Sequence, residues 1–287
     1  MTRTSRCLRY GGPWFSAASA LPIAGGLSQP AALVGLFGAA VRRPWRLVAA
    51  AGFLIGAPRI EVVLSESAAG GLLRAYFNQR FLGVIPQARL CRGVLTVPSD
   101  ADEYLHGRSR RALRNNLRRA AASGIRCDTV TGVSDASHAV QVVVPQRREA
   151  VTAQAHAALT GHWPELFAQP GVTTMVARDA GGKPIGVAGV VIDDQICLIR
   201  LAVASSHEAR WALHDYLVRA LMDSGVRYLL AADGGPMGAL GLTPQVQYFQ
   251  HLLGYDVCHI KIRREVTVPH PADLLGMGLA GQRRSTT

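Results

Sequence analysis

Three short β-rich runs separated by turns, and the helix that follows them, constrain the fold more than any other feature. The runs VTTMVARD, IGVAGVVI and ICLIRLAV are rich in valine and isoleucine, and the turn sequences AGGKP and DDQ separate them. Short strands joined by tight turns predict an antiparallel meander that ends at residue 203.

A long helix is predicted directly after this meander. Ser205 and Glu208 have the spacing of a capping box, and apolar residues then recur with helical period until Gly225. A strand is predicted at residues 226–232. Antiparallel strands followed by strand–helix–strand units predict an α/β fold with a mixed, α+β type sheet.

The remaining elements are predicted by weaker patterns. Four further strands are expected, at residues 59–64, 89–98, 125–130 and 255–268. Six further helices are expected, at residues 67–80, 99–107, 109–123, 134–144, 146–159 and 243–253, with a break at Pro145 and a loop at residues 161–171.

The charge of the chain favours anionic partners without choosing among them. The formal net charge is +12, and nearly all basic residues are arginine, since lysine occurs only at Lys183 and Lys261. Such a balance suits phosphate-bearing cofactors, nucleic acid or an acidic membrane surface. The five cysteines have no CxxC spacing, which argues against a zinc site or disulfide framework and favours a reducing cytoplasm; Cys197 and Cys258 are expected to be buried.

One arginine-rich segment, SRRALRNNLRRAAASG at residues 109–124, has no acidic residue and ends in glycine. Its leucines and alanines form a narrow apolar stripe, as expected for a helix packed on a core. Arg110, Arg114 and Arg118 form a row at i, i+4 and i+8, and their repulsion favours an anion beside them. A solvated helix in an arginine-rich chain is the alternative.

The chain resembles the GNAT acyltransferases, and more narrowly their Fem-type branch, over roughly residues 98–265. The resemblance rests on the arginine-rich helix and the strand after it, on the strand–strand–long helix–strand unit at residues 186–230, and on YFQHLLGYDV at residues 248–257. It implies a GNAT-like domain over residues 98–265. Residues 1–97 are then an apolar α/β subdomain, alternatively a degenerate half of the same fold, and residues 266–287 a basic tail.

The resemblance implies acyl-CoA, such as acetyl-CoA, as cosubstrate, and no metal. Its pyrophosphate would lie at the start of the long helix, where free backbone N–H groups suit an anion, and its pantetheine arm along the preceding strand. The expected cofactor-binding residues are Leu201, Val203, Ser205, Ser206, His207, Glu208, Ala209, Arg110, Arg114 and Arg118.

The sequence departs from the GNAT pattern at two places. ASSHEAR replaces the family's glycine-containing pyrophosphate loop, and Gln250 stands where many relatives place an acid tyrosine. The nearby Tyr248 is predicted as the catalytic tyrosine, although the helix turns it to a different face. Asp233 is predicted as the base or amine ligand, although an aspartate before two glycines is also a common turn former. Arg200 is predicted as a ligand of a substrate carboxylate, and the loop with His162 and Trp163 as a pocket wall.

Three functions remain open. The first is an N-acyltransferase that passes an acyl group from acyl-CoA to an amine, peptide or amino-acid-like acceptor. The second is a Fem-type transfer from aminoacyl-tRNA, with the arginine-rich helix on RNA phosphates. The third is a non-catalytic basic protein at a membrane surface, through the apolar runs at residues 31–41 and 47–57, each too short for a ~18–20-residue span. The expected location is cytoplasmic, with membrane association as the alternative.

Overall fold

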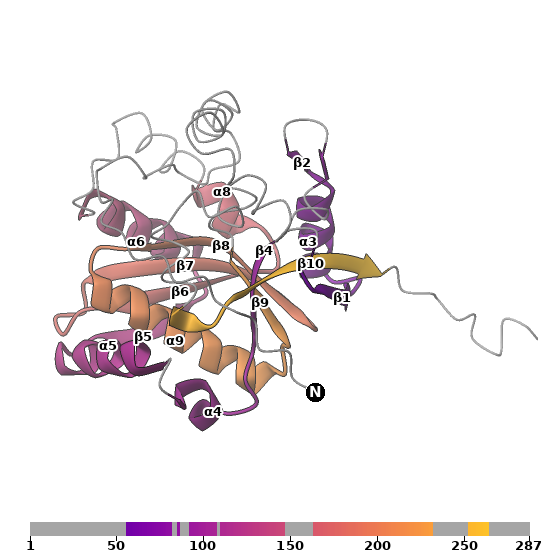
Figure 1. Ribbon diagram of the computed structural model, residues 1–287. Coiled ribbons are helices and arrows are strands. Elements are labelled where there is room, and N and C mark those ends of the chain that lie inside the picture. The colour runs from indigo at the N-terminus through magenta and orange to yellow at the C-terminus, as the bar shows by residue number, and fades with distance from the viewer. Residues whose placement is uncertain are drawn as a thin grey trace, which may run out of the picture.

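An eight-stranded mixed sheet with helices on both faces forms the body of the protein (Figure 1). The computed structural model describes residues 56–81, 85–86, 92–107, 110–146, 163–231 and 252–263. The strand order is β1-β10-β4-β9-β8-β7-β6-β5, and a separate pair is formed by β2 and β3. The predicted mixed α/β sheet is confirmed.

The strands are β1 (Arg59–Val63), β2 (Arg80–Phe81), β3 (Ile85–Pro86), β4 (Arg92–Thr96), β5 (Arg126–Val130), β6 (Val172–Arg178), β7 (Pro184–Asp193), β8 (Ile196–Ala204), β9 (Tyr228–Leu230) and β10 (Asp256–Arg263). The helices are α3 (Ala68–Asn78), α4 (Ala101–Leu105), α5 (Arg111–Ala122), α6 (Val133–Gln146), α8 (Trp163–Ala168) and α9 (His207–Ser224).

The sheet combines an antiparallel half with two parallel pairings. Strands β5 to β8 are antiparallel neighbours, as the turn sequences predict. Strand β9 returns parallel to β8 after α9, whereas β4 joins β9 and β10 antiparallel. Strand β1 lies parallel to β10 at the edge. Strands from both sides of the domain boundary predicted at residue 97 therefore belong to this one sheet.

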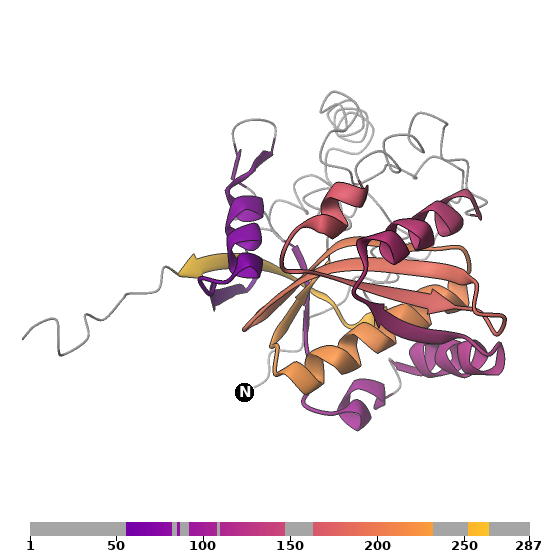
Figure 2. The same ribbon diagram turned by 180° about the vertical axis from the view of Figure 1, so that it is seen from behind.

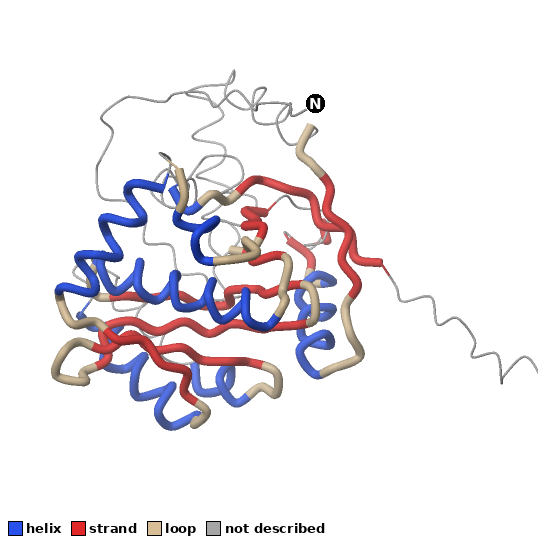
Figure 3. The backbone as a smooth tube through the Cα atoms, turned by 90° about the horizontal axis from the view of Figure 1, so that it is seen from below, coloured by secondary structure: helices blue, strands red, loops and turns tan. Residues whose placement is uncertain are grey.

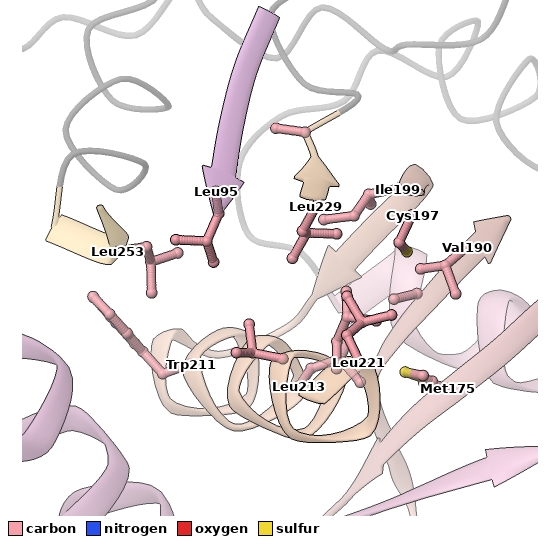
Figure 4. Close-up of a cluster of buried hydrophobic side chains, with 14 of the residues drawn as sticks. Leu95, Met175, Val190, Cys197, Ile199, Trp211, Leu213, Leu221, Leu229 and Leu253 are labelled. Carbon is pink, nitrogen blue, oxygen red and sulfur yellow. The ribbon is translucent and has the colours of Figure 1, made fainter. Parts of the chain in front are cut away.

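One face of the sheet is covered by α4, α5 and α9, which lie below the strands in Figure 2. The buried side of α9 supplies Leu213 and Leu221, which point toward the sheet with Leu95 of β4 and Leu229 of β9, and Trp211, which points toward Leu253 (Figure 4). Large apolar side chains from the helix and the sheet thus form one buried hydrophobic layer, and their removal from water stabilises the folded state.

The other face carries α3, α6 and α8, so that strands are sandwiched between helices (Figures 2 and 3). Helix α3 packs Leu73 and Phe77 against Val94 and Leu198 of the sheet. Helices α6 and α8 cover a separate cluster with Leu201 at the far end of β8. The boundary between these two clusters crosses β8 near residue 200.

Three local expectations are wrong. Residues 163–168 form α8 rather than a loop, and α6 continues past Pro145 to residue 146. The N-cap of α9 is Ser206, one residue after the predicted capping box. Among the described residues, no helix has both the length and the apolar character that a membrane crossing requires.

Candidate functional site

Strands β8 and β9 run side by side over only part of their length. Ile196 pairs with Tyr228 and Leu198 with Leu230, where β9 ends, while β8 continues to Ala204. In the part of the chain that the structure describes, no strand pairs with residues 199–204 on this side. We call residues 199–204 the open edge of β8. Its backbone N–H and C=O groups can pair with an extended ligand.

Arg200 lies on the open edge at a β-bulge. Gly189 of β7 pairs with Leu201 and Val190 pairs with Ile199, which leaves Arg200 as the extra residue. Its guanidinium carbon lies 5.4 Å from the centre of the Tyr76 ring on α3. Among the described residues, Arg200 forms no ion pair, and burial lowers the pKa of its guanidinium.

A second arginine, Arg92 at the start of β4, lies over the same ring at 4.8 Å. Its side chain is only 2% exposed, and burial lowers its pKa while Tyr76 opposes that change. Val94 and Leu198 both pair with Leu230, so Arg92 and Arg200, each two residues away, extend toward the same face of the sheet. We call Tyr76, Arg92 and Arg200 the arginine–tyrosine cluster.

Of these three residues, only Arg200 was predicted from the sequence as a site residue. A usable signal existed for Arg92, because it stands two residues before Val94 and must share the buried face of that strand. No local pattern identifies Tyr76, since only the packing of α3 on β4 and β8 brings its ring between the arginines.

Side chains at the start of α9 form hydrogen bonds with neighbouring groups. The Ser206 hydroxyl accepts a hydrogen bond from the Ala209 amide at 3.0 Å, and Ser205 donates to the Ile185 carbonyl at 3.1 Å. His207 Nε2 accepts from the Trp211 indole at 2.8 Å, so the proton of a neutral His207 lies on Nδ1. These contacts use groups that a bound pyrophosphate would otherwise engage.

Of the three arginines predicted to form a row on α5, two bond to backbone carbonyls and one is exposed. Arg110 donates to the Leu252 carbonyl at 3.2 Å, and Arg114 donates to the Leu105 and Gly107 carbonyls at the end of α4. Arg118 is exposed and donates to Asn115. Two of the three therefore satisfy backbone carbonyls at helix ends, and binding of a donor by this row stays a prediction.

The outer face of α5, defined by Arg111, Arg118 and Arg119, is the exposed basic surface of that helix. Residues 104–127 contain no aspartate or glutamate, so no acidic side chain on this segment neutralises the three arginines. The helix packs its opposite side on the core through Leu113 and Ala120. This surface is suited to phosphates of a nucleic acid.

Several predicted site residues have no role that the structure displays. Asp233, Tyr248, Gln250 and His162 lie outside the described residues. Leu201, Val203 and Ala209 are buried among core side chains, which leaves only their backbone for a ligand, and Glu208 is half-buried in the first turn of α9.

The described cysteines are unsuited to nucleophilic chemistry. Cys197 and Cys258 are buried, as predicted, and burial raises the pKa of the Cys197 thiol. Burial likewise raises the pKa of Cys127 to about 12. No group of three metal-ligating side chains occurs within the described ranges. At the open edge of β8, the described residues offer backbone, arginine and tyrosine groups for binding and positioning a substrate.

Comparison with known proteins places this chain near a different set of structures from those expected. No protein-family model and no curated protein sequence matches it. Similar solved structures include a domain designated the DUF2156 C-terminal domain of a putative lysylphosphatidylglycerol synthetase from Agrobacterium fabrum, with 14% identity and a TM-score of 0.40. L-PGS from Bacillus licheniformis has 10% identity and a TM-score of 0.41. A Bacteroides thetaiotaomicron protein of unknown function has 10% identity and a TM-score of 0.46.

These matches cover 58% of this chain and only 56–57% of the matched chains. The GNAT and Fem-type assignment is wrong, because the structures found bear other designations. The expectation of acyl-CoA as cosubstrate is wrong for the same reason: the designations that specify an activity are those of lysylphosphatidylglycerol synthetases. The hydrogen bonds made by side chains at the start of α9, and the absence of glycine from the segment ASSHEAR, agree with this correction.

Proposed function

We propose that this chain is an aminoacyltransferase that takes an aminoacyl group from aminoacyl-tRNA and passes it to a second substrate. The open edge of β8 carries this proposal. An extended, ester-bearing substrate can pair with the backbone of residues 199–204, where β9 has already ended. Holding the ester beside the acceptor supplies much of the rate of such a transfer.

A tRNA donor is favoured by the outer face of α5. Arg111, Arg118 and Arg119 present three exposed positive charges, and the chain as a whole carries +12. Phosphate contacts of this type position a nucleic acid without reading its sequence.

The reaction itself is ordinary acyl transfer. The acceptor oxygen or nitrogen attacks the ester carbonyl carbon, and the bond from that carbon to the tRNA ribose oxygen breaks. A base removes the acceptor proton and passes a proton to the ribose oxygen, which leaves as a hydroxyl. We retain Asp233, which follows β9 in the chain, as the proposed base.

A transfer assay with the full chain tests this function. The protein is incubated with tRNA charged with radiolabelled amino acids, together with phosphatidylglycerol vesicles or soluble amines as acceptors. We expect label to leave the tRNA for one acceptor, and the Asp233→Asn variant to be slower by at least 10-fold. Free amino acid with uncharged tRNA is the control. Label that stays on tRNA with every acceptor would contradict the proposal.

A further inference from the structure

The arginine–tyrosine cluster joins three elements that are distant in the sequence. Tyr76 comes from α3, Arg92 from β4 and Arg200 from β8, and both guanidinium carbons lie within 5.4 Å of one ring centre. Arginine over an aromatic face is stabilised by the ring, but the ring leaves the net positive charge in place. Two positive charges therefore meet at one phenol on the face of the sheet that carries α3.

The members of the cluster differ in accessibility. Arg92 is 2% exposed, so it supplies charge and holds the Tyr76 ring from within the protein. Tyr76 and Arg200 are half-buried and reach the surface. Charged side chains in such positions are ordinarily paired with an acid, yet the described residues provide no carboxylate for Arg200.

The position of Arg200 links the cluster to the open edge of β8. Arg200 is itself the bulged residue of that edge, and bulges commonly redirect a side chain beside a functional site. An acceptor held beside a donor ester that pairs with residues 199–204 would therefore lie next to the Arg200 guanidinium. An anionic group on that acceptor would complete the charge balance that the fold leaves open.

We propose that Arg200 and the Tyr76 hydroxyl, backed by Arg92, bind one phosphate-ester group of the acceptor substrate. Arginine binds phosphate through its fork of N–H donors, and a phenol adds one O–H donor. Donors that approach from different elements suit the tetrahedral oxygens of a phosphate better than the planar oxygens of a carboxylate. The assignment of this phosphate to the acceptor rests on the proposed transfer function, but phosphate binding can be measured without any transfer reaction.

Binding by the full chain to soluble and lipid phosphates tests the proposal. The probes are sn-glycerol 1-phosphate in calorimetry, and phosphatidylglycerol vesicles in co-sedimentation, with oleate-containing vesicles of equal surface charge as the carboxylate comparison. We expect Arg200→Gln to weaken phosphate binding at least 10-fold and Tyr76→Phe to weaken it several-fold. Arg59→Gln removes an exposed arginine on β1 and should leave binding unchanged.

Each possible binding result either supports or overturns the phosphate site at Arg200. Loss of binding to both phosphate probes in Arg200→Gln supports a general phosphate-ester site, and loss of binding to vesicles alone supports a lipid headgroup. Equal binding by Arg200→Gln and the wild type, or equal binding of oleate and phosphatidylglycerol vesicles through Arg200, would overturn the proposal. Tyr76→Phe keeps the ring and its packing, so its binding defect is interpretable even if Arg200→Gln is unstable. Binding of tRNA by Arg200→Gln should persist, which separates this site from the tRNA surface.

Discussion

At the scale of single residues, the fold buries an ionisable side chain, His214, between two tyrosines. It lies on the buried side of α9, where its Nδ1 is 3.2 Å from the Tyr104 hydroxyl and its Nε2 is 2.9 Å from the Tyr255 hydroxyl. A neutral imidazole has one donor and one acceptor nitrogen, so one tyrosine donates to the ring and the other accepts. Burial, followed by the charges of Arg210 and Arg110, lowers the pKa of His214 to about 3.

This pKa predicts a loss of stability as the pH falls. In the unfolded chain a histidine takes up a proton near pH 6.5, whereas folded His214 stays neutral down to about pH 3, so protonation favours unfolding across that window. The free energy of unfolding should fall by about 1.4 kcal/mol per pH unit below pH 6.5 from this group alone.

Urea titrations between pH 7 and pH 5 measure this dependence. The His214→Gln variant should show a flatter profile, because glutamine keeps hydrogen-bonding groups but does not titrate in this range. His138→Gln removes an exposed histidine of α6 and serves as the matched control. A profile of His214→Gln as steep as that of the wild type would contradict the buried neutral state.

At the scale of elements, most helices and strands follow from local patterns, and the exceptions have physical causes. The meander, α9 and the end of α9 at Gly225 were predictable because the turn sequences, the helical period and the terminal glycine agree there. Pro145 fails to break α6 because it lies in the last turn, where a proline removes only one backbone hydrogen bond. Serine is a common N-cap residue, so both Ser205 and Ser206 are candidates. Ser206 is the cap because the Ser205 hydroxyl is already bonded to the Ile185 carbonyl of β7, a contact that the local sequence does not reveal.

The two adjacent glycines of α3 should respond oppositely to alanine. A Cβ on Gly70 would lie 2.0 Å from the backbone oxygen of Ser65, whereas a Cβ on Gly71 would meet nothing within 4 Å. Alanine is favoured over glycine by about 1 kcal/mol inside a helix. We therefore expect Gly71→Ala to stabilise the protein by about that amount and Gly70→Ala to destabilise it by more than about 1 kcal/mol.

Thermal and urea unfolding of the two variants provide the measurement, and each is the control for the other. Equal effects of the two substitutions would show that Gly70 does not lie directly against the Ser65 backbone.

The Ser206 side chain that caps α9 should contribute measurably to stability. Ser206→Ala removes the acceptor for the Ala209 amide and should lower the free energy of unfolding by about 1 kcal/mol. Ser206→Asp keeps an acceptor and adds a negative charge at the helix start, so it should preserve stability. Urea midpoints compare the two, and a stable Ser206→Ala variant would place the cap elsewhere.

At the scale of the whole molecule, the class of sheet was predictable but its completion was not. The order of predicted elements gives a mixed sheet, yet nothing local shows that β4 inserts between β9 and β10 or that β1 joins β10. Those pairings link segments more than a hundred residues apart and depend on packing. The site has the same limit: Arg200 could be predicted as a mid-strand charge, but its meeting with Tyr76 and Arg92 required the assembled sheet.

The net charge of +12 predicts that tRNA binding by the whole protein weakens as salt rises. Each arginine that binds a phosphate releases a counterion, so removing one such arginine makes the plot of log affinity against log salt shallower by about 0.7–0.9. Replacing Arg111, Arg118 and Arg119 together by glutamine should therefore reduce the slope by about 2–3.

A matched control removes the same amount of charge from the opposite edge of the sheet, by replacing Arg59, Lys261 and Arg263, which lie on β1 and β10. Filter binding over a range of about 50–300 mM salt compares both triple variants with the wild type. General attraction between a basic protein and tRNA would reduce the slope equally in the two variants, and that result would remove α5 as the tRNA-binding helix. A reduction confined to the α5 variant locates the phosphate backbone on this helix, because only arginines that bind phosphates directly release counterions one by one.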